Sequence, residues 1–215
     1  MKGVLLMLDF KKEFKYLYQP KATPSVVDVP EMIFIAIDGK GDPNTSAEYA
    51  AAVETLYGLS WAIKMSNKSV LEYVVPPLEG FWRADDDFKD DDAPTTDKGK
   101  FVWTMLIRQP DFVTNEVFDA AKTALHKKKS NLNVSNARLV KLTEGLCVQV
   151  MHIGAYDDEP ATIATMERYA GENGYVFDMS DGRRHHEIYL SDPRKVMPEK
   201  LKTVIRYPIK RAMSS

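Results

Sequence analysis

The stretch IFIAIDG at residues 33–39 has a counterpart, CVQVMHIG, at residues 147–154. Each is an apolar run of strand length that ends at a glycine, which is typical of a buried strand. After each glycine the pattern predicts a helix, over about 47–64 and about 159–169, and then two more strands. The order strand–helix–strand–strand thus occurs twice. We predict an α+β fold of two β-α-β-β modules with pseudo-two-fold symmetry around a central pocket lined from both halves.

The two modules are expected to form one domain over residues 31–210, divided into repeats 31–110 and 111–210. Residues 1–30 are predicted to be a leader with a short amphipathic helix over 9–18. Residues 84–100 hold six Asp between positions 85 and 92. Such a density of like charge cannot bury itself and predicts a solvated loop. The other expected elements are strands at 71–75, 78–83, 101–108, 185–190 and 202–209, a helix over 114–129, and a hairpin of 138–142 with 146–153. The helix over 47–64 is expected to bury Ala50, Val53, Tyr57 and Trp61.

The composition excludes several classes of protein. Lys and Arg number 29 and Asp and Glu 31, so the net charge of -2 lacks the basic excess of a nucleic-acid-binding protein. No stretch approaches the ~20 apolar residues of a membrane span, and the first residues lack a signal-peptide core. The single Cys147 cannot form an internal disulfide, which favours a cytoplasmic location. We expect no metal and no cofactor, since four His and one Cys leave little material for a zinc site.

A candidate site lies in the stretch HHEIYLSDP at residues 185–193. Side chains alternate along a strand, so His185, Glu187 and Tyr189 share one face, while Ile188 points into the core. If the shared face lines a pocket, desolvation would raise the pKa of the Glu187 carboxyl group. The group would then suit proton transfer or the binding of a cation. A solvated strand face explains the same alternation, so the pattern leaves both interpretations open.

Aromatic residues supply candidate walls for such a pocket. Trp82 follows a Pro-Pro break, and Trp103 shares one face of the next strand with Met105. Ordinary core packing would explain these positions equally well. Tyr156 lies in a strand-to-helix turn, where its phenol could donate or accept a hydrogen bond, although an exposed turn tyrosine also fits. The acids that follow are explained as helix-start anions: Asp157, Asp158 and Glu159.

Several of these motifs together resemble a known family. The stretch EIYLSDP at 187–193 is similar to the closing motif of GyrI-like small-molecule-binding proteins. The stretches FKKEFKYLYQP at 10–20, PLEGFW at 77–82 and WTM at 103–105 extend the resemblance. They resemble a stand-alone subgroup that includes cyclopropanoid cyclopropyl hydrolases. The likeness covers residues 9–210.

The resemblance implies a site and an activity. In the family a carboxylate of the closing strand lies at the base of the pocket, which corresponds to Glu187. In the hydrolases a tyrosine assists it; Tyr156 is the best match, with Tyr189 and Tyr73 as alternatives. Aromatic walls correspond to Trp82 and Trp103, and Met105 and the two alternative tyrosines are further expected ligand contacts. The implied substrates are DNA-alkylating natural products with a strained cyclopropane, which Glu187 would open by activating water.

The alternative is a module that binds small molecules without turnover. Glu187 would then pair with a lipophilic cation, and Trp faces would add cation–π attraction. Either function predicts a small aromatic or lipophilic ligand as the partner, and a monomer or weak homodimer. Neither function predicts contact with nucleic acid or membrane.

Overall fold

The computed structural model describes residues 7–84, 97–180 and 182–213. Most of the predicted acidic loop, residues 85–96, and positions 1–6 of the leader lie outside this description. The strands form one antiparallel sheet with the order β1-β6-β9-β8-β3-β4-β2-β5, and β7 adds to β9. The bounds are β1 Ser25–Val29, β2 Met32–Lys40, β3 Leu78–Ala84, β4 Phe101–Gln109, β5 Arg138–Leu142, β6 Gly145–Ile153, β7 Tyr175–Phe177, β8 His185–Tyr189 and β9 Lys202–Arg211.

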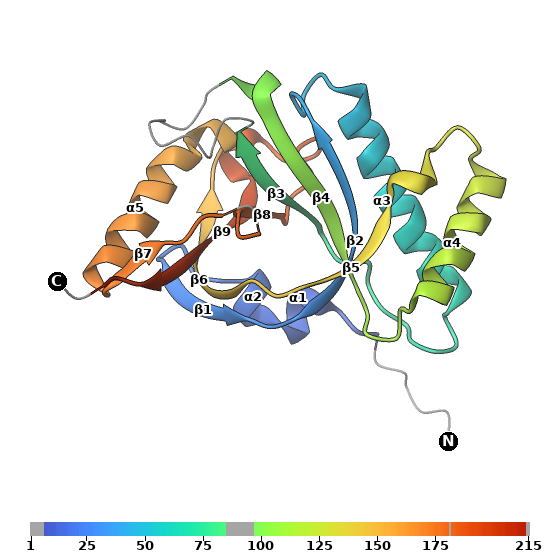
Figure 1. Cartoon of the computed structure of the whole chain (residues 1–215), viewed down its shortest axis with the longest axis horizontal. Coiled ribbons are helices and arrows are strands. Elements are labelled where there is room, and N and C mark those ends of the chain that lie inside the picture. Colours follow the sequence, from blue (N-terminus) through green and yellow to red (C-terminus); the bar gives the residue numbers. More distant parts are fainter. Residues whose placement is uncertain (1–6, 85–96, 181, 214–215) are drawn as a thin grey trace.

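The strand order confirms the two predicted modules. The first module has the spatial order β2-β4-β3 and the second has β6-β9-β8, so that β3 and β8 meet in the middle. Each module contributes one long helix between its first and second strands in chain order: α3 (Ala47–Ser66) in the first and α5 (Glu159–Glu172) in the second. The two helices lie at opposite ends of the curved sheet (Figure 1). The middle of the sheet is therefore the place that both modules share.

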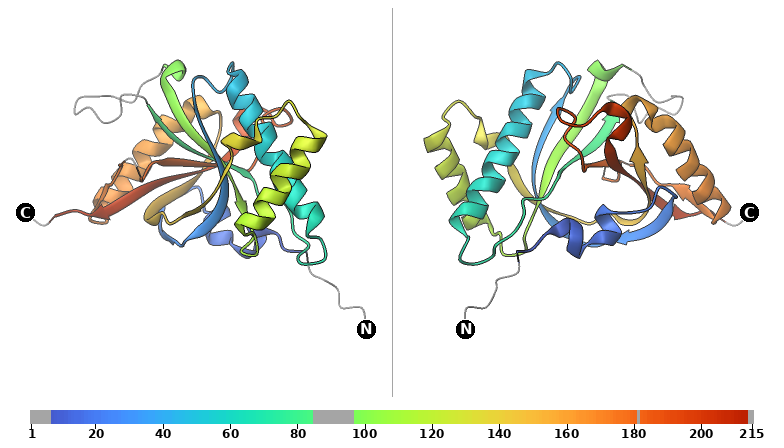
Figure 2. Two further views of the ribbon diagram at one scale, coloured as in Figure 1. Left: turned by 45° about the vertical axis from the view of Figure 1, so that its right-hand side comes forward. Right: turned by 180° about the vertical axis from the view of Figure 1, so that it is seen from behind.

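Three further helices complete the fold. The chain over 9–18 forms two four-residue helices, α1 (Phe10–Glu13) and α2 (Lys15–Tyr18), instead of the single predicted helix. They lie beside β1, away from α3 and α5, as both views in Figure 2 show. Helix α4 (Asn115–Lys128) begins at the predicted cap Thr114 and packs on α3. None of the described helices combines the length and the apolar character needed to cross a membrane.

The predicted hairpin around Glu144-Gly145 is wrong. Strand β5 pairs with β2, whereas β6 pairs with β1 and β9. Only two residues separate β5 from β6 along the chain, yet the two strands stand near opposite ends of the strand order. The sheet must therefore curl until these ends approach each other, as β1, β5 and β6 show at the bottom of Figure 1. Local alternation predicted both strands, but it contained no information on their partners.

Two other local predictions are wrong. Residues 71–75 form no strand, and Tyr73 makes only an isolated bridge with Leu8. In α3 the most buried apolar residues are Ala52, Leu56, Leu59 and Ile63, whereas Trp61 is half exposed. This helix is apolar on several sides because it packs on both the sheet and α4. The spacing of apolar residues alone could not show which apolar face of α3 is the most buried.

The buried side chains form separate clusters on the two faces of the sheet. One face packs against α3 and α4 through residues that include Ile35, Trp103 and Met105. The α5 end of the sheet has its own cluster, which includes Val150 and Ile205. The opposite face, with Phe34 and Ile188, is covered by the short N-terminal helices and Tyr73. Glu187 therefore lies on the face that carries the long helices, because it alternates with Ile188 along β8.

Gly39 provides a test of packing in the first module. A Cβ atom there would lie only 2.1–2.7 Å from three carbons of the Trp103 ring. Both partners are held in adjacent strands, since Gly39 pairs with Trp103 across β2 and β4. We expect Gly39→Ala to lower the free energy of unfolding by about 1–3 kcal/mol, the usual cost of overpacking. Chemical denaturation measures this, and Gly171→Ala, where the new Cβ meets nothing within 4 Å, should cause no such loss.

Candidate functional site

Glu187 lies at the junction of the two modules. In β8 it pairs with Gly80 of β3, and Gly80 in turn pairs with Met105 of β4. Because Gly80 has no side chain, this row of the sheet has space between the Met105 and Glu187 side chains. A Cβ atom on Gly80 would lie 2.8 Å from the Trp82 indole nitrogen, so the Trp82 ring crosses this space. The site is thus built on rigid strands from both halves.

Aromatic rings surround this position from the first module. The Trp82 indole nitrogen donates a 2.8 Å hydrogen bond to the Tyr189 hydroxyl group, which ties β3 to β8. Tyr49 of α3 packs beside Trp82, with ring centroids 6.2 Å apart. Its ring also meets Trp103 edge to face, at 5.3 Å. Trp82 and Tyr49 are half-buried, so both keep ring surface available for contact with a ligand.

The second module supplies the remaining polar groups. Tyr156 begins the short turn η3 (Tyr156–Asp158) before α5, and its ring meets Tyr189 edge to face at 5.9 Å. Glu159 is the first residue of α5 and is only 5% exposed. The Tyr189 hydroxyl group and the Glu159 carboxyl group both act on the Glu187 carboxyl group, and one oxygen of Glu159 lies within 4.8 Å of one oxygen of Glu187. The second module therefore supplies the polar groups around Glu187, and the first module supplies the Trp82 and Tyr49 rings.

Burial controls the electrostatics of these groups. Burial raises the pKa of Glu187 to about 7, even though the hydrogen bonds from Tyr189 and Glu159 oppose the shift. The pKa of Glu159 rises to about 10 because of burial and then the neighbouring charge of Glu187. Burial and Glu187 also raise the pKa of Tyr156 to about 12. Near neutral pH, Glu187 is therefore the group that exchanges protons, while Glu159 and Tyr156 remain protonated donors.

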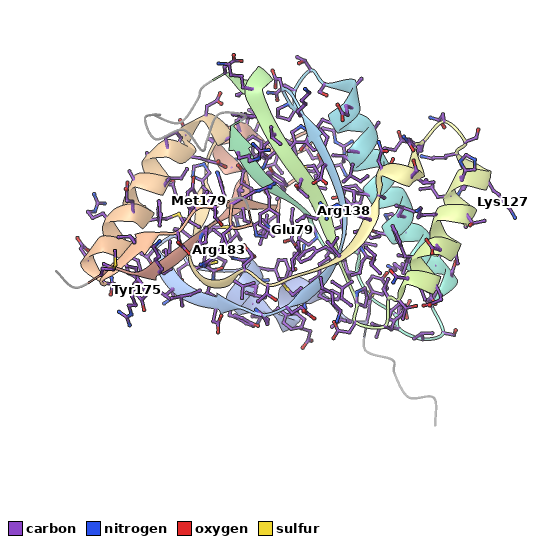
Figure 3. The ribbon with its side chains drawn as sticks, in the orientation of Figure 1. Glu79, Lys127, Arg138, Tyr175, Met179 and Arg183 are labelled. Atoms are coloured by element: carbon purple, nitrogen blue, oxygen red, sulfur yellow. The ribbon has the colours of Figure 1, made fainter. Side chains whose placement is uncertain are left out.

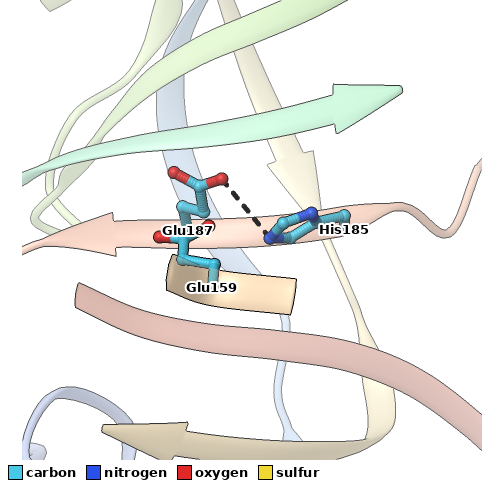
Figure 4. Close-up of side chains that lie close together, drawn as sticks. All are labelled: Glu159, His185 and Glu187. Carbon is cyan, nitrogen blue, oxygen red and sulfur yellow. Dashed lines mark ion pairs between the residues drawn. The ribbon is translucent and has the colours of Figure 1, made fainter. Parts of the chain in front are cut away.

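His185 completes the polar cluster (Figure 4). Its Nε2 atom lies 3.4 Å from the Glu187 carboxylate. Burial and the nearby charge of His186 lower the pKa of His185 to about 3, so its imidazole is neutral. Among the described residues, Glu159, His185 and Glu187 are the group whose ligand atoms could surround a metal ion, all within 4.8 Å of one another. A proton held by Glu159, whose pKa is raised to about 10, accounts for the same close approach of the two carboxyl groups.

A second polar network lies under the site on the opposite face of the sheet. His186 contacts Glu79 and Glu144 at 3.0 Å each, and Arg206 contacts Glu144 at 2.7 Å. Burial would lower the pKa of His186, but the two carboxylates raise it to about 9. Figure 3 shows Glu79 in the interior of the molecule. The charged His186 lowers the pKa of Glu187 through the strand.

The structure places the predicted site residues in different surroundings. Trp82, Tyr156 and Tyr189 lie together around Glu187, as described above. Met105 is fully buried beneath them, and Trp103 is 0% exposed, so neither presents a free surface. The buried Trp103 ring instead packs edge to face against the Tyr49 ring.

Tyr73 does not join this group. It packs against Phe10 and Phe112 in the cluster on the opposite face, which also holds Ile188. The segment before β3 forms no strand there, so alternation along it says nothing about the face to which Tyr73 points.

Two cavities in the described part of the chain lie away from Glu187. The larger, about 260 Å³, lies between α3 and α4, and its lining includes Ile63, Asn67 and Val117. The smaller, about 10 Å³, lies beside Glu144 and Arg183. Over Gly80, in the middle of the sheet, the Trp82 indole and the Met105 side chain occupy the space beside the strand.

Sequence reasoning missed Glu159 and Tyr49. Glu159 has the spacing of the inward face of its helix, since Ile163, Met166 and Ala170 follow at intervals of four, three and four. A charged residue in such a stripe signals a buried functional group. For Tyr49 the sequence offers no comparable signal, because its approach to Trp82 depends on how α3 crosses the sheet.

Two β-α-β-β halves with an acidic, aromatic-lined site at their junction define a two-module small-molecule-binding protein. The chain belongs to the GyrI-like family: the model of the GyrI-like small molecule binding domain matches residues 22–210.

Solved structures agree with this assignment. An uncharacterized conserved protein from Listeria innocua is 44% identical, with a TM-score of 0.88, and the match covers 94% of this chain and 100% of that chain. A hydrolase from Listeria innocua is also 44% identical, with a TM-score of 0.86, and the match covers 95% and 100%. The C-terminal domain of EcmrR, 14% identical with a TM-score of 0.52 over 88% and 98%, shares the fold. Among curated proteins the comparison found no match.

Proposed function

We propose that this chain hydrolyses the cyclopropane of DNA-alkylating natural products and so detoxifies them, with Glu187 as the general base. The buried Glu187 carboxylate, with a pKa near 7 and aromatic rings beside it, carries this proposal. A general base works best when its pKa is near the working pH. The 44% identity to proteins described as hydrolases supports an enzymatic function.

The proposed reaction adds one water molecule to the substrate. The water oxygen attacks the cyclopropane CH₂ carbon and transfers a proton to Glu187. The strained C–C bond breaks, and its electron pair moves into the conjugated dienone, whose oxygen becomes a phenolate. Glu187 then releases its proton to the solvent and the phenolate takes one up, so that water has been added overall and the resting charges are restored. Relief of ring strain supplies driving force, so no cofactor is needed for the balance of atoms and electrons.

The two tyrosines of the site have different proposed roles. The Tyr189 hydroxyl group already accepts from Trp82, and in the proposed mechanism it donates to Glu187 and so holds the base in place. Tyr156 is half-buried, and within the described residues no hydrogen bond engages its hydroxyl group. Its phenol stays protonated and can donate to the oxygen on which charge develops. Trp82 and Tyr49 are the rings that stack on the planar substrate.

Binding without turnover is the second candidate function. Among the ion pairs of the described residues, no Lys or Arg joins Glu187. The carboxylate is therefore available to pair with a lipophilic cation against the Trp82 face.

The two candidates are separated by one experiment. Purified protein is incubated with a cyclopropane-bearing duocarmycin-type compound, and the loss of dienone absorbance is followed. Catalytic turnover supports the hydrolase. Saturable binding without loss of absorbance would contradict the hydrolase and leave the binding module.

The pH dependence of hydrolysis should report the ionisation of the base. Glu187 must be ionised to accept a proton, and its pKa is about 7. We expect kcat/KM to fall about tenfold per pH unit below pH 7 and to level off above it. Stopped assays across pH 5–9, with stability checked at each pH, measure this. A profile that is flat across this range would rule out Glu187 as the titrating base.

A further inference from the structure

Two carboxyl groups share the centre of the site. One oxygen of Glu159 and one of Glu187 lie within 4.8 Å of each other. Glu159 is 5% exposed and its Oε1 atom has no hydrogen-bond partner, while the Glu187 side chain is 12% exposed. No Lys or Arg of the described residues forms an ion pair with either. Two buried carboxylates this close cannot both be ionised, so one must hold a proton.

The surroundings decide which carboxyl group holds the proton. Tyr189, Glu159 and the charge of His186 all lower the pKa of Glu187 and so favour its anion, against the effect of burial. Glu159 is more deeply buried and faces the charge of Asp157 as well as that of Glu187. The start of α5 favours an anion at Glu159, but this effect is smaller than the cost of a second buried charge. The proton therefore belongs to Glu159.

We propose that Glu159 is a positioning residue: it stays protonated, donates a hydrogen bond to Glu187, and so orients that carboxylate and keeps it ionised. This inference rests on the proposed role of Glu187 as the general base. It assigns to Glu159 a role in the site different from that of a helix-start anion. Glu159 itself touches neither water nor substrate in the reaction.

Several titratable groups face the pair and remain in every variant. They come from β8, α3, η3 and the opposite face of the sheet, and they are His185, Tyr189, Tyr49, Tyr156, Asp157 and His186. The tyrosines and His185 stay neutral near pH 7 and His186 stays charged. If substitution of Glu159 alone shifts the pH profile of kcat/KM, the shift therefore comes from the Glu159–Glu187 pair.

Two substitutions of similar size separate the proposed role from a structural one. Glu159→Gln keeps a neutral hydrogen-bond donor. Its kcat/KM should therefore stay within about threefold of the wild-type value, and the fall of kcat/KM at low pH should still be centred near pH 7. Glu159→Leu removes the donor and excludes replacement water. We expect it to move the limb upward by about one pH unit and to lower kcat/KM about tenfold at pH 6, as a hydrogen bond to a charged group predicts. Circular dichroism and thermal unfolding establish that both variants fold.

The outcomes distinguish the alternatives. If Glu159→Gln loses as much activity as Glu187→Gln, Glu159 acts as an ionised group and the proposal is wrong. If Glu159→Leu keeps the wild-type pH profile, Glu159 is only structural. If Zn²⁺ or Mn²⁺ binds tightly to the wild type and not to Glu159→Gln, the carboxyl pair holds a metal ion instead of a proton.

An infrared measurement tests the proton without reference to activity. At pH 8 the wild type should show the C=O stretch of one buried protonated carboxyl group, and Glu159→Gln should lack it. Persistence of the band in Glu159→Gln would overturn the assignment even if hydrolysis is confirmed. Absence of hydrolysis with the expected infrared change would overturn the proposed function and leave the proton on Glu159.

Discussion

Glu187→Gln is expected to hydrolyse the cyclopropane substrate with a kcat/KM about 10²–10⁴-fold below that of the wild type, the contribution usual for a general base. The amide has nearly the shape of the carboxylate and keeps an oxygen that can accept from Tyr189. It cannot accept the proton of the attacking water. Loss of dienone absorbance under pseudo-first-order conditions measures the effect, and fluorescence titration shows whether the variant still binds the substrate.

A matched control removes one carboxylate elsewhere in the second module. Glu172 is the exposed last residue of α5, so Glu172→Gln changes the net charge equally without touching the site. Its kcat/KM should match the wild type. Wild-type turnover by Glu187→Gln would contradict the role assigned to Glu187, whatever the control shows.

The largest effect on stability is expected at Arg206. This side chain is 1% exposed, and it donates to Glu144 at 2.7 Å, to the backbone carbonyl of Leu17 at 3.0 Å and to Gln149 at 3.2 Å. Arg206→Ala would leave Glu144 buried with only His186 as a counter-charge. It would also remove one of the hydrogen bonds that join α2 to the sheet. We expect the free energy of unfolding to fall by about 3–5 kcal/mol.

Denaturant titration of Arg206→Ala and Arg194→Ala makes this comparison directly. Arg194 also pairs with a carboxylate, Asp192 at 2.9 Å, but its side chain is 85% exposed. Surface pairs contribute about 0–1 kcal/mol, so this control should unfold at nearly the wild-type denaturant concentration. Equal losses in the two variants would show that burial does not determine the strength of the Arg206 network.

Neither pair was predicted from the sequence, and the two differ in how far apart their residues lie along the chain. Asp192 and Arg194 are two residues apart, and their contact is local. Glu144, His186 and Arg206 come from three distant segments that meet only when β6, β8 and β9 lie side by side. The sequence around His186 therefore gave no sign of the carboxylates that surround its imidazole in the structure.

The sequence by itself determined the family and the repeated element order, because buried strands and capped helices leave local periodic patterns. It also identified Glu187, Trp82 and Tyr156 as candidate site residues through their motifs and their alternation. The sequence did not determine which strands pair. Strands β5 and β6 follow each other along the chain, but β5 pairs with β2 of the first module and β6 with β9 of the second.

Only the tertiary structure decided the composition of the site. It brought Glu159 and Tyr49 to Glu187, sent Tyr73 to the opposite face, and buried Trp103 behind Tyr49. The pairing of β3 with β8 across the junction of the modules brings Gly80 and Trp82 to Glu187 and Tyr189. Packing between segments that are distant along the chain follows from how complete surfaces fit together, and no local pattern of residues encodes it.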